Sequence, residues 1–350
     1  MYSTTKGEMH IRPGIFDKIP AIAKGSKVLV SGANGFLAIW TTQLLLERGY
    51  SVRGTVRSEN KSKYLKDYFA SIGYKDKLEV VFVEDISKDG AFDEAVQNVD
   101  AILHIASPIA AVISPDEMIR PAIEGTTGIL KSALKTGNKV KRIVVTSSTS
   151  AVMPPVIDKP TVLSELDWDT HFPRRKARKL TNKQFIAPLR RAWDYYNTHK
   201  LQTQWDITTL TPSWPPIHEV KSASSLNYSL AVWYNTVIEN KTSTKEFLSA
   251  SQAWVDVRDL ALAHILALEN PEAGGERILV TGVDAANSLS PTLLPSHNPL
   301  PVGYPEMTKE QRTYNLLFDT SKQKRLLDIR FRSLEETTKD IFECISERGW

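Results

Sequence analysis

The sequence predicts an α/β fold, a doubly wound parallel sheet with a smaller second lobe made of discontinuous segments. The first half of the chain alternates short apolar runs with longer runs of helical periodicity, which is typical of βαβ units. This alternation breaks after Pro212, where the chain becomes polar and rich in proline. Sheets of this kind bind their ligands at the carboxyl ends of the strands, so we expect the functional residues there.

The expected elements follow the same patterns in order. Strands are expected at 27–30, 51–56, 78–83, 101–105, 142–146 and 206–211. Helices are expected at 39–48, 61–72, 93–96, 118–136 and 181–200. Residues 213–250 and 281–312 are expected to be irregular. The sheet pattern returns between these two segments, with a helix at 255–269 and a strand at 277–280, and the chain closes with a helix at 334–349.

The turn after the first strand carries a glycine pattern, with Gly32, Gly35 and Ala38 at G-x-x-G-x-x-A spacing. Gly32 lets the chain turn sharply, Gly35 lets a diphosphate approach the backbone, and Ala38 lets the helix pack on the strand. The N-terminus of that helix offers free N–H groups to phosphate. A strand before and a helix after favour a dinucleotide site over a purely structural turn. Further candidate contacts in the turn are Asn34, Phe36 and Leu37.

We expect the chain to be organised in three parts around this site. Residues 1–26 form a polar arm, and residues 27–212 form the dinucleotide-binding domain, which residues 253–281 complete. Residues 213–252 and 282–350 form the second lobe and the closing helix.

Composition narrows the class of protein. The formal net charge of +4 is too small to favour nucleic-acid binding. The single cysteine, Cys344, excludes an internal disulfide and fits a reducing, cytoplasmic compartment. No apolar run approaches the ~20 residues that span a bilayer, and residues 1–26 lack the apolar core of a signal peptide. We expect no bound metal and no membrane partner.

The end of the second strand indicates which dinucleotide binds. An acidic residue there would bind the ribose 2′-hydroxyl of NAD, but the sequence has Arg57 and Ser58 instead. A guanidinium can bind a 2′-phosphate through two parallel hydrogen bonds, and Lys61, with Arg53 and Lys63, adds positive charge. The alternative is a solvated basic patch. The position at the strand end favours NADP(H).

The chain resembles the extended short-chain dehydrogenase/reductases, within them the dihydroflavonol reductase, cinnamoyl-CoA reductase and methylglyoxal reductase group. The resemblance covers roughly residues 26–345, with the usual boundary error of a few residues. It implies a Rossmann domain with a substrate lobe, a small-molecule substrate, and a monomer or homodimer. The segments that carry it are Ser31–Phe36, Thr55–Arg57, Glu84–Ser87, His104–Pro108, Glu124–Thr126, Val144–Ser148, Leu210–Pro212, Trp254–Asp259 and Phe331–Glu335.

The resemblance also implies roles for single residues. Ser148, or Ser147 if the register differs by one, would hydrogen-bond the substrate carbonyl; the alternative is a hydroxyl that caps a strand end. Further cofactor contacts are implied beside the adenine, at the cofactor sugar and beside the nicotinamide: Asp85, Ile86, Ala106, Ser107, Pro108, Thr146 and Pro212.

The proton-donating pair of the family is replaced in this chain. The family uses Tyr-x-x-x-Lys, in which the tyrosine protonates the carbonyl oxygen and the lysine lowers its pKa from ~10. Counting back from Ala192–Tyr195 places these two positions at Thr181 and Phe185. Tyr196 and Lys200 also fit the spacing, but roughly 22 Å further along the same helix, so we expect Tyr196 to be a packing residue.

Three other side chains are candidate proton donors: Lys183, His171 and His104. Each has a plainer interpretation, since Lys183 is expected to be a solvated helix residue and His104 to be structural, while His171 lies in a loop. The basic run Arg174–Lys179 could attract an anionic substrate, although a solvated loop is the favoured interpretation.

Three functions remain open at this point. The first is an NADPH-dependent reductase of a specialised small-molecule pathway that acts on an activated C=N or C=C/C=O group without the tyrosine. The second is a non-redox cyclase or isomerase that keeps NADP(H) as a structural cofactor, which suits the apolar Phe185. The third is an inactive NADP-binding protein. The retained Arg57 favours the first, because a site that still selects NADP is expected to use it.

Overall fold

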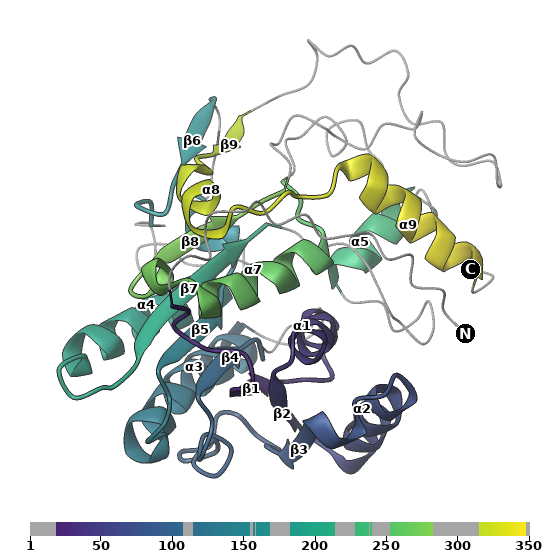
Figure 1. Ribbon diagram of the computed structural model, residues 1–350. Helices are drawn as coiled ribbons and strands as arrows, with labels where there is room; N and C mark the ends of the chain where they lie inside the picture. The colour runs from purple at the N-terminus through teal and green to yellow at the C-terminus, as the bar shows by residue number, and fades with distance from the viewer. Residues whose placement is uncertain are drawn as a thin grey trace, which may run out of the picture.

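The computed structural model describes residues 19–107, 115–154, 157, 159–168, 183–213, 228–237, 239, 253–282 and 315–347. At its centre is a seven-stranded sheet of order β3-β2-β1-β4-β5-β7-β8, in which every pairing is parallel (Figure 1). Its strands are β1 (Lys27–Ser31), β2 (Ser51–Val56), β3 (Leu78–Phe82), β4 (Ala101–His104), β5 (Arg142–Thr146), β7 (Asp206–Pro212) and β8 (Arg277–Val280). The order is that of a doubly wound sheet, which confirms the predicted fold.

Helices cover both faces of the sheet. Those of the described part are α1 (Phe36–Glu47), α2 (Glu59–Ser71), α3 (Pro115–Thr136), α4 (Lys183–His199), α5 (Tyr228–Val237), α7 (Val257–Glu269), α8 (Ser321–Leu327) and α9 (Leu334–Glu347). Short 3-10 turns lie at η2 (Lys75–Lys77), η3 (Thr149–Ala151) and η5 (Pro271–Ala273). A separate parallel pair joins β6 (Thr161–Leu163) to β9 (Leu316–Phe318).

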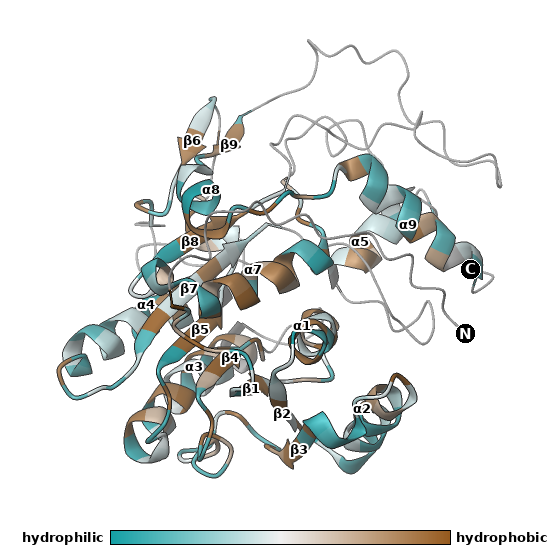
Figure 2. Cartoon of the chain, in the orientation of Figure 1, coloured by the Kyte–Doolittle hydropathy of each residue, from teal (hydrophilic) through white to brown (hydrophobic). Residues whose placement is uncertain are grey.

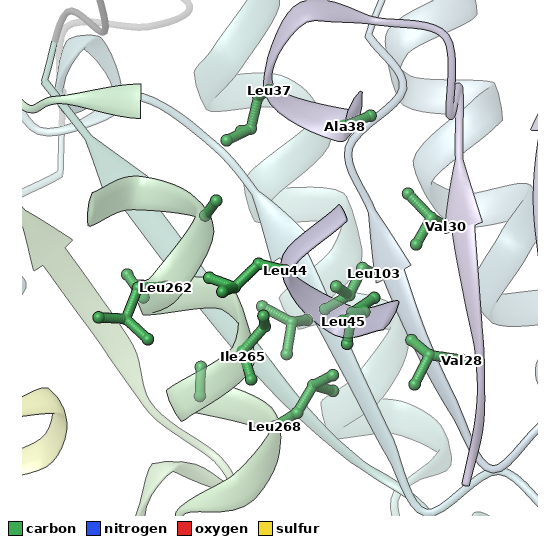
Figure 3. Packing of buried hydrophobic residues seen from close by; sticks show 14 of the residues in the cluster. Val28, Val30, Leu37, Ala38, Leu44, Leu45, Leu103, Leu262, Ile265 and Leu268 are labelled. Atoms are coloured by element: carbon green, nitrogen blue, oxygen red, sulfur yellow. The ribbon is translucent and has the colours of Figure 1, made fainter. Parts of the chain in front are cut away.

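Alternation along the strands builds two apolar cores. Val28 and Val30 of β1 belong to the core under α1 and α7, whereas Leu29 belongs to the core under α3 and α4. Figure 3 shows the first core, where Leu44 and Leu45 of α1 lie beside α7. α7 is largely brown in the hydropathy colouring and α2 largely teal, as expected for a buried and a surface helix (Figure 2).

The strand predictions were accurate and one helix prediction was wrong. Each of the six strands expected in the first half forms, with its ends within one residue of the prediction. The helix expected at 93–96 is a run of turns. The carbonyl of Asp93 accepts from the Thr136 hydroxyl at 2.9 Å and from the Gln97 side-chain amide at 3.2 Å. In an α-helix the Asp93 carbonyl would accept a backbone N–H four residues later, but here it accepts these two side chains instead.

The expectation of an irregular segment at 213–250 was wrong for α5. Trp233 of α5 is 1% exposed and packs edge-on against Phe342 of α9, with ring centroids 5.4 Å apart. The partner lies far along the chain, so local periodicity gave no sign of it. β6, β9 and α8 were also missed. The irregular segment expected at 281–312 and the terminal arm lie largely outside the described residues.

An ionic network fastens α9 to the start of α7. Asp256 accepts the N–H of Arg258 at 2.8 Å and thereby caps α7. The Arg258 guanidinium pairs with Asp256 at 2.7 Å and with Asp340 of α9 at 2.6 Å, and Thr337 donates to Asp256 at 2.9 Å. Through α9 and its contact with Trp233, α5 is held beside the nucleotide-binding core.

Candidate active site

The turn between β1 and α1 has the geometry of an anion site. Gly32 adopts φ +64°, and a Cβ there would lie 3.1 Å from the Cβ of Ala106. α1 begins at Phe36 directly after Gly35, and no side chain caps it or places an acidic group in its first turn. The first-turn N–H groups, including that of Leu37, are therefore left for a bound phosphate. The half-buried Asn34 completes the turn.

Two residues of β2, Gly54 and Thr55, hold this turn in place, although neither was predicted as a site residue by itself. The Gly32 N–H donates to Thr55 Oγ1 at 3.0 Å, and the Ala33 N–H donates to the Thr55 carbonyl at 2.9 Å. A Cβ on Gly54 would lie only 2.6 Å from the Ala33 Cβ. A glycine inside a strand often marks a place where another backbone comes close. The position of Gly54 within a predicted strand was therefore a sequence signal for this contact.

His104 is a structural residue and not a proton donor. It is 2% exposed, and burial lowers the pKa of its imidazole to about 4, so it is neutral near pH 7. Its Nδ1 lies 3.0 Å from the Ser31 hydroxyl and its Nε2 3.4 Å from the Thr126 hydroxyl. Both nitrogens are occupied inside the protein.

The residues expected around the adenosine lie at the ends of β2 and β3. Arg57 and Lys61 are exposed, at the end of β2 and in the first turn of α2. Hydrogen bonds from Ser87, with a smaller effect of the Lys88 and Arg57 charges, lower the pKa of Asp85, so Asp85 lies within electrostatic reach of Arg57. Arg53, by contrast, pairs with Glu79 at 3.0 Å and donates to backbone carbonyls, away from this site.

The side chain of Ile86 packs in the apolar core. It is 6% exposed, and a Cβ on Gly125 of α3 would lie 2.8 Å from its Cδ1. Ala106 and Ser107 are half-buried at the end of β4, whereas Pro108 lies outside the described residues. Pro212 ends β7 and pairs with Val280.

The end of β5 presents three hydroxyl groups in different environments. Thr146 Oγ1 lies 2.7 Å from Nε2 of His264, whose Nδ1 lies 2.7 Å from the Leu260 carbonyl. A carbonyl only accepts, so Nδ1 carries the proton and Thr146 donates to Nε2. Ser148 is half-buried and accepts the Ser150 N–H at 3.2 Å, and its own hydroxyl donates to none of the described residues. Ser147 is 8% exposed, and its hydroxyl has no partner within the described part of the chain.

Ser147 has a neighbour of the same kind on β7. The pairing of β5 with β7 ends at Thr146 and Leu210; the next residue, Ser147, donates its N–H to the Leu210 carbonyl at 2.7 Å, and Thr211 follows Leu210 in β7. Neither hydroxyl is hydrogen-bonded to any residue that the structure describes. Of the two candidate serines, Ser148 is the one whose hydroxyl is oriented and accessible.

α4 begins at the ligand edge of the sheet and runs away from it. Trp193 donates to Thr209 at 3.4 Å, and one turn further Tyr196 stacks on Trp205, just before β7, with ring centroids 5.8 Å apart. Tyr196 is therefore a packing residue far from the site, as expected. Lys183 and Phe185 lie in the first turn of α4, but their side chains, like Thr181, His171 and the run 174–179, fall outside the described residues.

Comparisons with known proteins agree with this geometry. The profile of the NAD dependent epimerase/dehydratase family matches residues 28–185. The chain is 34% identical to an oxidoreductase of Schizosaccharomyces pombe, covering 93% of this chain and 98% of that one. It is 31% identical to the NADPH-dependent methylglyoxal reductase GRE2 of Saccharomyces cerevisiae, covering 89% and 96%. The chain belongs to the extended short-chain dehydrogenase/reductases of this family.

A solved structure extends the likeness to three dimensions. Yeast methylglyoxal/isovaleraldehyde reductase Gre2 complexed with NADPH superposes with a TM-score of 0.76 at 26% identity, covering 92% of this chain and 99% of that one. The cinnamoyl-CoA reductase CAD2 of Medicago truncatula is 31% identical over 93% of this chain and 97% of its own. These relatives confirm the family expected from the resemblance and the fold expected from the alternation of strands and helices.

Two further properties concern the described residues as a whole. Within them, no group of three or more histidine, cysteine and acidic side chains is arranged to hold a metal ion. None of their helices is long and apolar enough to cross a membrane.

Proposed function

We propose that the protein is an NADPH-dependent reductase of specialised small-molecule metabolism that reduces an activated C=N, C=C or C=O group without the tyrosine and lysine of its family. The proposal rests on the sequence, where Thr181 and Phe185 stand at the two positions that the family resemblance implies for this pair, while the glycine turn between β1 and α1 is intact. When bound, NADPH supplies a hydride. The exposed Arg57 and Lys61 support a 2′-phosphate contact.

The missing pair restricts the substrates that this site can reduce. A neutral ketone becomes an alkoxide and needs an acid, and a threonine hydroxyl is a far weaker acid than a phenol. An iminium ion needs no acid, because reduction neutralises a charge that is already present. A conjugated enone is intermediate, since the free proton of Ser148 can be donated to the enolate oxygen. We therefore expect activated substrates.

A non-redox cyclase or isomerase is the second candidate, favoured by the apolar Phe185 at the lysine position. In that case NADP(H) is a structural cofactor and the pocket shapes the substrate. An inactive NADP-binding protein is the third. Deuterium at the transferable position of NADPH separates them. Label in the product supports the reductase, label retained through turnover indicates the cyclase or isomerase, and no turnover of any activated substrate indicates the binding protein.

Restoring the lost pair tests the role of positions 181 and 185 directly. The double variant T181Y/F185K should raise turnover of simple ketones, whereas either single change should help little, because tyrosine alone keeps a high pKa. Fast reduction of simple ketones by the unmodified protein would contradict the proposal. The cytoplasmic location, and a monomer or homodimer, stay predictions.

A further inference from the structure

Ser31 joins the ends of two neighbouring strands through a single hydroxyl group. Its Oγ accepts the N–H groups of Ile105 and Ala106, both at 3.0 Å. A hydroxyl has two lone pairs and one proton, so these two bonds leave only the proton. Nδ1 of His104 lies 3.0 Å from the same oxygen and is the acceptor for it. The orientation of the Ser31 hydroxyl is therefore fully determined.

The surroundings of His104 make it an acceptor toward Ser31. Nε2 lies 3.4 Å from the Thr126 hydroxyl, which has lone pairs to receive the Nε2 proton. The Phe92 ring packs edge-on against the imidazole, with centroids 6.0 Å apart. A neutral ring with its proton on Nε2 satisfies both contacts and leaves the Nδ1 lone pair for Ser31.

The backbone that Ser31 fixes is one wall of the phosphate-binding turn. Gly32 follows Ser31 directly, and a Cβ on Gly32 would lie 3.1 Å from the Ala106 Cβ and 3.3 Å from its Cα. Ala106 therefore lies where a side chain on Gly32 would have to fit, so the end of β4 borders the turn closely. The backbone pairing of β1 with β4 ends at Ser31 and His104, and the Ser31 hydroxyl extends it by binding the next two N–H groups of the chain after β4.

We propose that His104 is a positioning residue for the dinucleotide, which acts by accepting the Ser31 proton and so directing both Ser31 lone pairs to the end of β4. The inference rests on the proposed function only in requiring that a dinucleotide binds at this turn. It assigns His104 to cofactor affinity and not to proton transfer, even though it lies within the catalytic domain.

The test compares dinucleotide dissociation constants in two His104 variants. His104→Phe keeps an aromatic ring but removes the acceptor, and should weaken NADPH binding by roughly fivefold to tenfold, the effect of one lost buried hydrogen bond. His104→Asn places a carbonyl oxygen near the Nδ1 position and should restore affinity to within about twofold of the original protein. The value of kcat at saturating cofactor should change less than KM for NADPH.

Two further variants separate positioning from loss of stability. Ser31→Ala removes the shared hydroxyl and should weaken binding as His104→Phe does, and the double variant should be no worse than either. Tyr50→Phe removes a buried hydroxyl that donates to Glu269 at 2.9 Å, next to the amino end of β2. It should lower thermal stability and leave NADPH affinity unchanged.

The outcomes distinguish this inference from the proposed function. Folded His104→Phe and Ser31→Ala variants with unchanged affinity would overturn the positioning role alone. If His104→Phe does not fold, the Ser31→Ala result decides. An original protein that binds neither NADPH nor NADH would overturn both ideas, since the pyrophosphate is common to the two cofactors.

Discussion

Buried hydroxyl groups differ in their hydrogen bonding between the two halves of the sheet's carboxyl edge. In the cofactor half, formed by β1, β2 and β4, the Ser31 hydroxyl accepts two backbone N–H groups at the end of β4, and the Thr55 hydroxyl accepts the Gly32 N–H of the phosphate turn. In the substrate half, formed by β5 and β7, the hydroxyls of Ser147 and Thr211 are buried without a hydrogen bond in the described part of the chain. A buried unpaired group costs about 1–3 kcal/mol. The protein itself therefore fixes the Ser31 and Thr55 hydroxyls, whereas no described residue fixes those of Ser147 and Thr211.

The largest effect should come from breaking the packing of the cofactor half. Gly54→Val places a Cβ within 2.6 Å of the Ala33 Cβ and must displace the turn. Overpacking costs about 1–3 kcal/mol, so we expect a lower melting temperature and up to roughly 100-fold weaker NADPH binding. Calorimetry and fluorescence titration measure the two effects.

A matched glycine shows whether the loss is specific to the turn. Gly49 adopts φ +89°, and a Cβ there would meet no atom within 4 Å. It lies at the opposite edge of the sheet, just before β2. Gly49→Ala should lower stability through backbone strain yet leave cofactor affinity unchanged. Equal losses of affinity in the two variants would contradict a preformed turn.

Cofactor selection should show the next largest effect. Arg57→Ala should weaken NADPH binding by roughly 10- to 100-fold, the value of a charge-assisted bidentate contact, and leave NADH binding nearly unchanged. Lys66→Ala removes the same charge from an exposed position of α2 and should change neither constant by more than about twofold. If the original protein bound NADPH and NADH equally well, Arg57 would not select the cofactor.

Features that depend on neighbouring residues could be predicted from the sequence, whereas features that depend on distant residues could not. The strand positions and the phosphate turn followed from patterns within a few residues, such as the spacing of Gly32 and Gly35. His264 acts through a contact with Thr146, a residue distant in the chain, which local patterns do not record. The turns around Asp93 depend on a hydroxyl from α3. Tertiary contacts decided each of these cases.

The candidate serines illustrate the limit within the site. The resemblance could not separate Ser147 from Ser148, because a shift of one residue in register leaves the motif unchanged. The hydrogen bond from the Ser150 N–H gives Ser148 a different environment from Ser147, and the choice between the two stays a prediction. That Thr181 and Phe185 stand at the positions of the family's tyrosine and lysine stays a prediction, which rests on the spacing back from Ala192–Tyr195 in the sequence.

The substrate half can be tested through its serines. Ser148→Ala should lower turnover by roughly tenfold or more while NADPH affinity changes little, because the variant removes an oriented donor to the substrate. Ser147→Ala removes an unpaired buried hydroxyl of the described region, so it should have a smaller effect on turnover and could raise stability. A larger loss of turnover in Ser147→Ala than in Ser148→Ala would reverse the assignment.

The smallest effect concerns the two buried histidines, one on each half. Burial lowers the pKa of both His104 and His264 to about 4, below the value of about 6.5 in an unfolded chain. Between these values the unfolded state binds protons that the folded state does not, so stability falls as pH decreases from about 6.5 to 4. Each histidine contributes at most about 1.4 kcal/mol per pH unit. Asp259 acts in the opposite sense, because burial raises its pKa to about 6.

A comparison of variants therefore isolates the histidine contribution better than the pH profile of one protein. His264→Gln removes one titrating group from the substrate half, so its urea midpoint should depend less steeply on pH between about 7 and 5 than that of the original protein. His104→Asn should reduce the slope by a similar amount from the cofactor half, since both imidazoles are buried. If both variants had the same slope as the original protein, burial would not keep these two histidines neutral in the folded state. The fixed orientation of the Ser31 and Thr146 hydroxyls would then need another cause.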